Sequence, residues 1–101
     1  MASVDLGAGP VEFEVSFWTL LLYEEEFDGA DLIQDIMAKG GVVRWGCVIR
    51  ALWACLKAHD DATPPLAEWA RGITGVNMPV ALGTVMPAIQ DGLFREAPSE
   101  A

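Results

Sequence analysis

Residues 42–59 read VVRWGCVIRALWACLKAH, the longest stretch of the chain with helical periodicity. Successive side chains of an α-helix are turned by ~100° about its axis. One broad arc then holds Trp45, Val48, Ile49, Leu52, Trp53 and Leu56, and the opposite side holds Arg50, Ala54 and Lys57. We therefore predict a helix over 42–59 in the middle of the fold. Because Trp53 lies at the edge of the arc, we expect its side chain to be partly exposed.

The residues before this helix predict one short strand and two helices. Residues 11–15 alternate apolar and acidic side chains, which is typical of a half-buried strand. This strand would pair with a second copy of the chain or form an extended arm. Ser16 is a suitable N-cap for a helix over 17–27, and a second helix begins at Asp28 or Ala30 and runs to about 38. The apolar stripe of the second helix is Leu32, Ile33, Ile36 and Met37, and Gly40 and Gly41 end it.

Two further helices follow in the C-terminal half. Thr63 is expected at an N-cap with Pro64 at the first helical position, and this helix extends to about 73. It would place Leu66, Trp69 and Ile73 inward, and Glu68 and Arg71 outward. Residues 77–94 form a last helix that Pro87 should kink or split.

These elements predict an all-α fold. It is a small bundle of four to five helices around a central third helix, with at most one short N-terminal strand. The chain divides into a flexible lead-in at 1–10 where no packing is expected, a single helical domain at 11–96 and a disordered tail at 97–101. With 101 residues there is room for one core.

The balance of charge and hydropathy limits the partners. The formal net charge is −9, and residues 1–35 carry nine acidic residues and no Lys or Arg. This disfavours nucleic acid, whose phosphates require clustered bases. The acidic third would attract a basic partner, or serve only as a solvated face. The nine acids are Asp5, Glu12, Glu14, Glu24, Glu25, Glu26, Asp28, Asp31 and Asp35.

The mean hydropathy of +0.31 is high for a small domain and indicates surplus apolar surface. Self-association, a protein partner or a membrane would cover such a surface. The apolar run 17–23 is far shorter than the ~18 residues of a membrane-spanning helix. No secretion signal is recognised either, so we expect no membrane association and a cytoplasmic location.

The sequence offers no convincing chemistry. Cys47 and Cys55 lie eight residues apart in one helix, ~12 Å along its axis, which is too far for a disulfide. His59 shares a helical face with Cys55, but two ligands are too few for a metal site. Adjacent glutamates at 24–26 point in different directions, so they do not form a catalytic carboxylate pair, and Glu26 is expected to pair with a base of the 42–59 helix. We predict no enzyme activity, no metal and no cofactor.

Four tryptophans in one small chain are dense, and large aromatics serve both cores and protein contacts. Each tryptophan is more readily explained as a core residue than as a contact residue. The candidate partner-binding residues come from three predicted helices: the helix over 17–27, the helix over 42–59 and the helix that ends at about 73. The set is Trp18, Leu22, Trp45, Ile49, Trp53, Leu56 and Trp69.

Several segments occur in an order that resembles a known family. LLLYEEEF (20–27) is followed by GADL (29–32), and then by RALWACLKAHDD (50–61) and TPPLAEW (63–69). Over about residues 11–73 the chain is similar to the tail assembly chaperones of long-tailed bacteriophages and prophages. Residues 77–94, with Pro79 and Pro87, depart from that pattern.

The resemblance implies a small helical protein that binds the long, hydrophobic tape-measure protein and helps tail-tube subunits assemble around it. It also implies self-association and a location in the cytoplasm of the bacterial host. Many members of the family are made in a short form and a frameshift-extended form, and this chain would correspond to the short form. The alternative is a homo-oligomeric structural or adaptor protein of a phage without chaperone activity. A small metal- or ligand-binding domain is a third reading.

Overall fold

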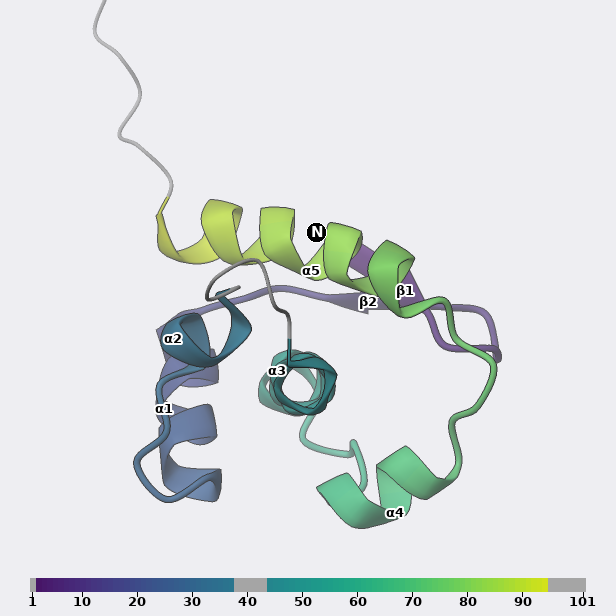
Figure 1. Ribbon diagram of the computed structural model, residues 1–101, viewed down its shortest axis with the longest axis horizontal. Helices are drawn as coiled ribbons and strands as arrows, with labels where there is room; N and C mark the ends of the chain where they lie inside the picture. Colours follow the sequence, from purple (N-terminus) through teal and green to yellow (C-terminus); the bar gives the residue numbers. More distant parts are fainter. Residues whose placement is uncertain (1, 38–43, 95–101) are drawn as a thin grey trace, which may run out of the picture.

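The computed structural model describes residues 2–37 and 44–94 (Figure 1). Two strands come first and five helices follow in the described residues. They are β1 (Ala2–Asp5), β2 (Pro10–Phe13), α1 (Phe17–Glu26), α2 (Leu32–Ile36), α3 (Trp45–His59), α4 (Leu66–Arg71) and α5 (Met78–Leu93). The predicted glycine stop at 40–41, the start of the third helix at 42–43 and the tail at 97–101 lie outside the described residues.

β1 and β2 form an antiparallel hairpin in which Ala2 faces Phe13 and Asp5 faces Pro10. At the turn, an Asp5 carboxylate oxygen accepts a hydrogen bond from the Gly7 N–H at 2.8 Å. The all-α prediction is therefore wrong, and so is the expectation that residues 1–10 do not pack. The strand predicted at 11–15 pairs with this chain's own first residues, neither with a second copy nor as a free arm. Val4 and Phe13 on the inner face are buried, and this burial stabilises the hairpin.

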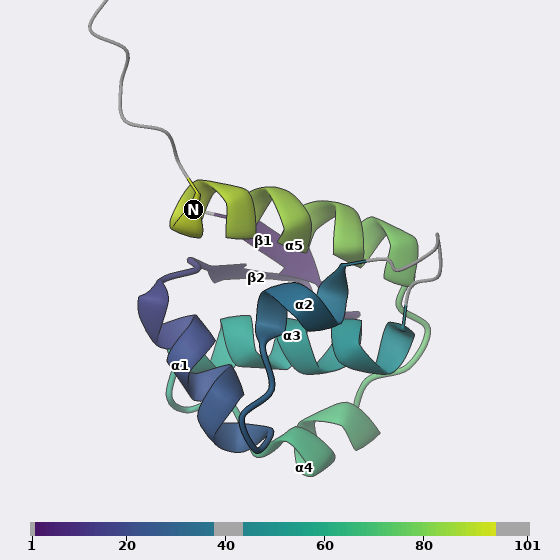
Figure 2. The ribbon, with the colours of Figure 1, turned by 60° about the vertical axis from the view of Figure 1, so that its left-hand side comes forward.

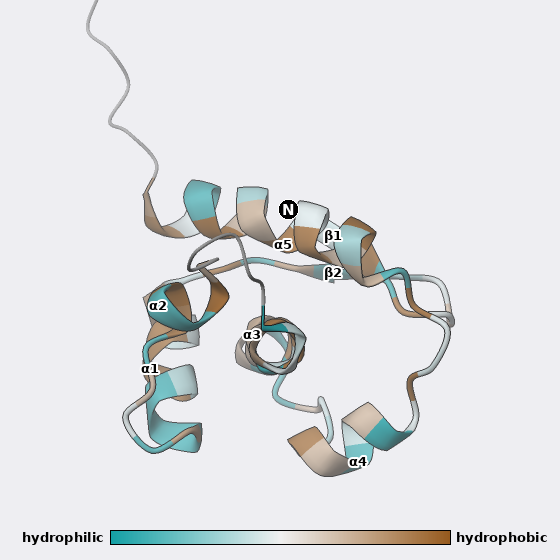
Figure 3. Ribbon diagram, viewed as in Figure 1, coloured by the Kyte–Doolittle hydropathy of each residue, from teal (hydrophilic) through white to brown (hydrophobic). Residues whose placement is uncertain are grey.

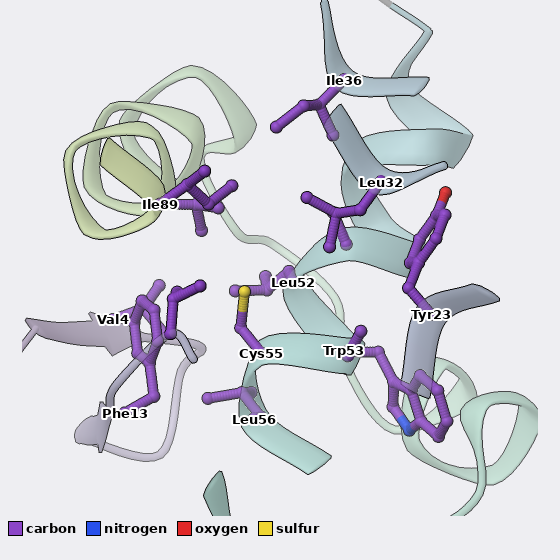
Figure 4. Packing of buried hydrophobic residues seen from close by; sticks show 14 of the residues in the cluster. Val4, Phe13, Tyr23, Leu32, Ile36, Leu52, Trp53, Cys55, Leu56 and Ile89 are labelled. Carbon is purple, nitrogen blue, oxygen red and sulfur yellow. The ribbon is translucent and has the colours of Figure 1, made fainter. Parts of the chain in front are cut away.

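The sheet lies between α5 and α3 in both ribbon views (Figures 1 and 2). α5 packs against β1, whereas α3 packs against β2 and also contacts the other four helices. The β-hairpin thus packs against one side of α3. The prediction that helices alone surround α3 in a bundle is therefore wrong. Side chains from the hairpin, α3 and α5 meet there, with Phe13, Cys55 and Ile89 in the same cluster (Figure 4).

The middle of α3 is buried on all sides, because all six residues 51–56 are at most 4% exposed. Trp53 is 2% exposed, so its predicted partial exposure is wrong, and Ala54 is buried although it lies opposite the predicted arc. The indole N–H of Trp53 donates to the Pro64 carbonyl oxygen at 2.9 Å, and its ring meets the Phe27 ring edge-on at 5.9 Å. The 60–64 turn and the end of α1 therefore cover a side of α3 that periodicity alone leaves open.

The helix starts follow local capping with small shifts. The Ser16 N–H donates to Thr19 Oγ1 at 3.1 Å at the predicted start of α1. α2 begins later than predicted, capped by Asp31, whose carboxylate accepts the Gln34 N–H at 3.1 Å. The left-handed backbone of Asp28 (φ 59°) argues against the earlier of the two predicted starts.

α4 begins at Leu66 with Pro65 at its N-cap, rather than at Pro64. α5 runs unbroken through Pro87, so the prediction that this proline splits the helix is wrong. Its start is capped by the Asn77 side chain, which accepts the Val80 N–H at 3.2 Å. Burial of Ala81, Val85 and Ile89 along one face offsets the hydrogen bond that Pro87 removes.

Candidate functional site

The structure divides the seven candidate partner-binding residues into three groups. Trp53 and Leu56 are buried in the core, so neither is available to a partner and both assignments are wrong. Leu22, Ile49 and Trp69 are half-buried. Trp18 is 49% exposed and Trp45 is 42% exposed, and these two keep large aromatic surfaces in solvent.

α1 carries the largest group of exposed apolar side chains in the first half of the fold. Phe17 is 72% exposed and Leu21 is 57% exposed, and both lie beside Trp18. At ~100° per residue these three side chains fall within about 100° of arc. Thr19 and Tyr23, the buried residues of α1, lie on the other side of the helix. We call Phe17, Trp18 and Leu21 the α1 apolar face.

Sequence reasoning found Trp18 but missed Phe17 and Leu21. Residues 17–23 are apolar almost all round the helix, so their periodicity does not say which side is buried. The available signal was that a short helix in a chain of this length cannot bury its whole circumference. Such a helix must leave apolar side chains exposed, although the sequence does not say which.

Contacts on the buried side hold α1 in this orientation. The Tyr23 hydroxyl donates to an Asp35 carboxylate oxygen at 2.8 Å, and the Tyr23 ring meets the Phe27 ring edge-on at 4.7 Å. Burial, and then the hydrogen bond to Asp35, raise the pKa of the Tyr23 phenol. Rotating α1 to bury Phe17 would break these contacts. The exposure of the α1 apolar face is therefore a fixed feature of the fold.

The C-terminal half of α1 is acidic, and hydropathy changes along this helix accordingly (Figure 3). Glu24, Glu25 and Glu26 are all exposed. The predicted pairing of Glu26 with a base of the 42–59 helix does not occur in the described residues. Arg50 instead lies over the Phe27 ring, 5.3 Å from its centroid, and Arg44 pairs with Asp35 at 3.6 Å.

A groove of about 750 Å³ adjoins the α1 apolar face at Phe17. Its walls are the connection between β2 and α1 on one side and α5 on the other, with Phe13, Val15 and Ala88 among its apolar lining. The exposed Glu14 is among the residues that line it. The groove continues the surface beyond α1 with a mixed lining, in which the apolar side chains lie among Ser16, Thr84 and Asp91.

In the part of the chain that the structure describes, the chemistry-bearing residues do not converge on a site. Cys47 and Cys55 are free thiols, as predicted. Burial raises the pKa of the Cys55 thiol to about 12, which keeps it protonated at neutral pH. Within residues 2–37 and 44–94, no group of three His, Cys, Asp or Glu side chains could hold a metal ion.

No helix in the described part of the chain is long and apolar enough to cross a membrane.

No protein-family model, curated protein or solved structure matches this chain. The likeness to tail assembly chaperones therefore depends on the sequence segments quoted above.

Proposed function

We propose that this protein is a non-enzymatic binding protein that holds an apolar segment of another polypeptide against the α1 apolar face. One observation supports this most directly: Phe17, Trp18 and Leu21 stand in solvent on a helix whose opposite side is fixed in the core. Aromatic side chains in such positions are typical of interface hot spots.

Covering the α1 apolar face would supply part of the free energy that specific binding requires. Full burial of one large apolar side chain is worth ~1.5–3 kcal/mol. The three side chains are about half to three-quarters exposed, so covering them would contribute roughly 3–5 kcal/mol before the costs of association. The adjoining groove beside Phe17 adds apolar area for a longer segment.

The resemblance suggests the client. In the tail assembly chaperone family the bound protein is the tape-measure protein, which is long, helical and hydrophobic. We propose the same role here: the chain keeps that protein in solution and assists assembly of the tail tube around it. A surface that presents apolar side chains inside an acidic coat supports a role of this kind.

Co-expression with a phage tape-measure protein tests the proposal. The wild-type chain should raise the soluble fraction of that protein, and Phe17→Gln/Leu21→Gln should abolish the rescue. Leu21→Gln has a matched control in Val80→Gln, because Val80 is also an exposed aliphatic residue of a helix, on α5. The control should rescue like wild type.

Light scattering on the same variants separates this function from the alternative of a purely homo-oligomeric adaptor. If Phe17→Gln/Leu21→Gln dissociates an oligomer of the chain while rescue of the client is unchanged, the α1 apolar face is a self-association surface and the proposed function is wrong. Loss of rescue with an unchanged oligomeric state supports client binding.

A further inference from the structure

We propose that the segment bound at the α1 apolar face is an amphipathic helix whose apolar stripe is followed, nearly two turns along, by Lys or Arg side chains. This inference rests on the proposed function and adds the chemical class of the partner. It is carried by the distribution of charge around the face, together with the geometry of α1.

Charge along α1 is arranged against the helix dipole. The last turn of a helix carries partial negative charge and is stabilised by bases. α1 has no base in its last turn, and Glu24, Glu25 and Glu26 occupy that end instead. These glutamates repel one another, and none of them forms an ion pair within the described residues. Lys or Arg side chains of a partner would offset both effects.

The apolar face is bounded by acids at both ends. The exposed Glu14 lines the groove beside Phe17, and Glu24 and Glu25 lie one turn after Leu21. No Lys or Arg occurs in residues 1–35. An apolar segment with acidic flanks would be repelled at both ends, whereas basic flanks complement them.

The spacing follows from helix geometry. α1 has 10 residues, so it is ~15 Å long at 1.5 Å per residue. The centre of the apolar face and Glu25 are about six residues apart, which is ~9 Å along the axis. A partner helix lying along α1 would therefore need its bases about six residues beyond the centre of its apolar stripe.

A second copy of this chain fits the face poorly. A two-fold dimer brings the same surface of both copies together. Parallel α1 helices would bring their glutamates together, and a full antiparallel overlap would cover the glutamates of each copy with apolar side chains. An antiparallel pair of α1 helices that is shifted along the axis avoids both of these contacts. In that pair the two helices overlap over only about five residues, ~7 Å, and Glu24–Glu26 still have no basic partner.

Three synthetic helical peptides of equal length test the proposal on the full chain. The first has a Leu stripe and Lys flanks at the stated spacing, the second has Glu in place of Lys, and the third keeps the Lys composition with the stripe scrambled. Fluorescence anisotropy of labelled peptide measures each Kd. We expect the first peptide to bind at least about tenfold tighter than the other two, which corresponds to two or three exposed ion pairs. The advantage over the Glu peptide should shrink as salt rises from low to high concentration.

Variants of the chain assign the effect to α1. Glu24→Gln/Glu25→Gln should weaken binding of the Lys peptide by about tenfold, and Gln keeps the helix propensity of Glu. Asp61→Asn/Glu68→Gln removes the same charge away from α1, from residues that are also exposed, and should leave the Kd unchanged.

The outcomes separate the inference from the proposed function. If the Lys and Glu peptides bind equally and Phe17→Gln/Leu21→Gln weakens both, client binding stands and the basic partner is wrong. If the scrambled peptide binds as well as the first, the peptide binds only through its net charge and the inference is wrong. The same conclusion follows if Glu24→Gln/Glu25→Gln and Asp61→Asn/Glu68→Gln weaken binding equally. If no peptide binds, or Phe17→Gln/Leu21→Gln changes nothing, the proposed function itself fails.

Discussion

Gly92 near the end of α5 packs directly against the backbone of Val15. A Cβ atom built on Gly92 would lie 2.2 Å from the Val15 carbonyl oxygen and 2.9 Å from its carbonyl carbon. Both are backbone atoms of the connection between β2 and α1, so a rotamer change cannot relieve the clash. Gly92→Ala must therefore push α5 and this connection apart by about 1 Å, and overpacking of this kind costs ~1–3 kcal/mol.

Gly83 provides the matched control within the same helix. A Cβ atom there has no atom within 4 Å, so Gly83→Ala gains only helix propensity. That gain is ~1 kcal/mol or less in a helix interior. We expect Gly83→Ala to be slightly more stable than wild type, and Gly92→Ala to be less stable by ~1–2 kcal/mol after its own smaller propensity gain.

Urea unfolding followed by tryptophan fluorescence measures both variants through their midpoints at constant slope. Each kcal/mol corresponds to about 4–8 °C in Tm for a domain near this size, so thermal unfolding gives an independent check. If Gly92→Ala were as stable as Gly83→Ala, the close packing of α5 against residue 15 would be wrong. The groove beside Phe17, which both elements line, would then need revision.

Two further predictions concern single side chains. A thiol reagent should modify the half-buried Cys47 in the native protein and reach Cys55 only on unfolding, because Cys55 is buried and its thiol has a raised pKa. Mass spectrometry of the labelled peptides measures this. Equal labelling of both cysteines in the native protein would contradict the prediction. Tyr23→Phe removes the hydrogen bond to Asp35 and should cost ~1–2 kcal/mol at neutral pH. The folded state holds the Tyr23 proton above the unfolded pKa of about 10, so this contribution is complete below pH 10 and is lost as pH rises. Urea midpoints of wild type and Tyr23→Phe should therefore converge above pH 10, and a constant difference would contradict the assignment. Tyr23 is the chain's single tyrosine, which makes the comparison clean.

Local signals in the sequence determined much of the helical content. Ser16 marks the start of α1, and the long apolar period between 45 and 59 is one helix. The eight-residue spacing of Cys47 and Cys55 excluded a disulfide. These features succeed because capping, helical rise and periodicity depend on residues within a few positions of one another.

Tertiary structure decided the features that depend on distant segments. Residues 2–5 become a strand only because residues 10–13 pair with them and α5 covers them, and nothing in four residues reveals that partner. Trp53 is buried because the 60–64 turn and Phe27 close over it. The sequence also does not determine which side of α1 is exposed. A helix that is apolar all round is oriented only by the elements it packs against. Here the Tyr23 contacts select the buried side, and Phe17 and Leu21 remain in solvent as a consequence.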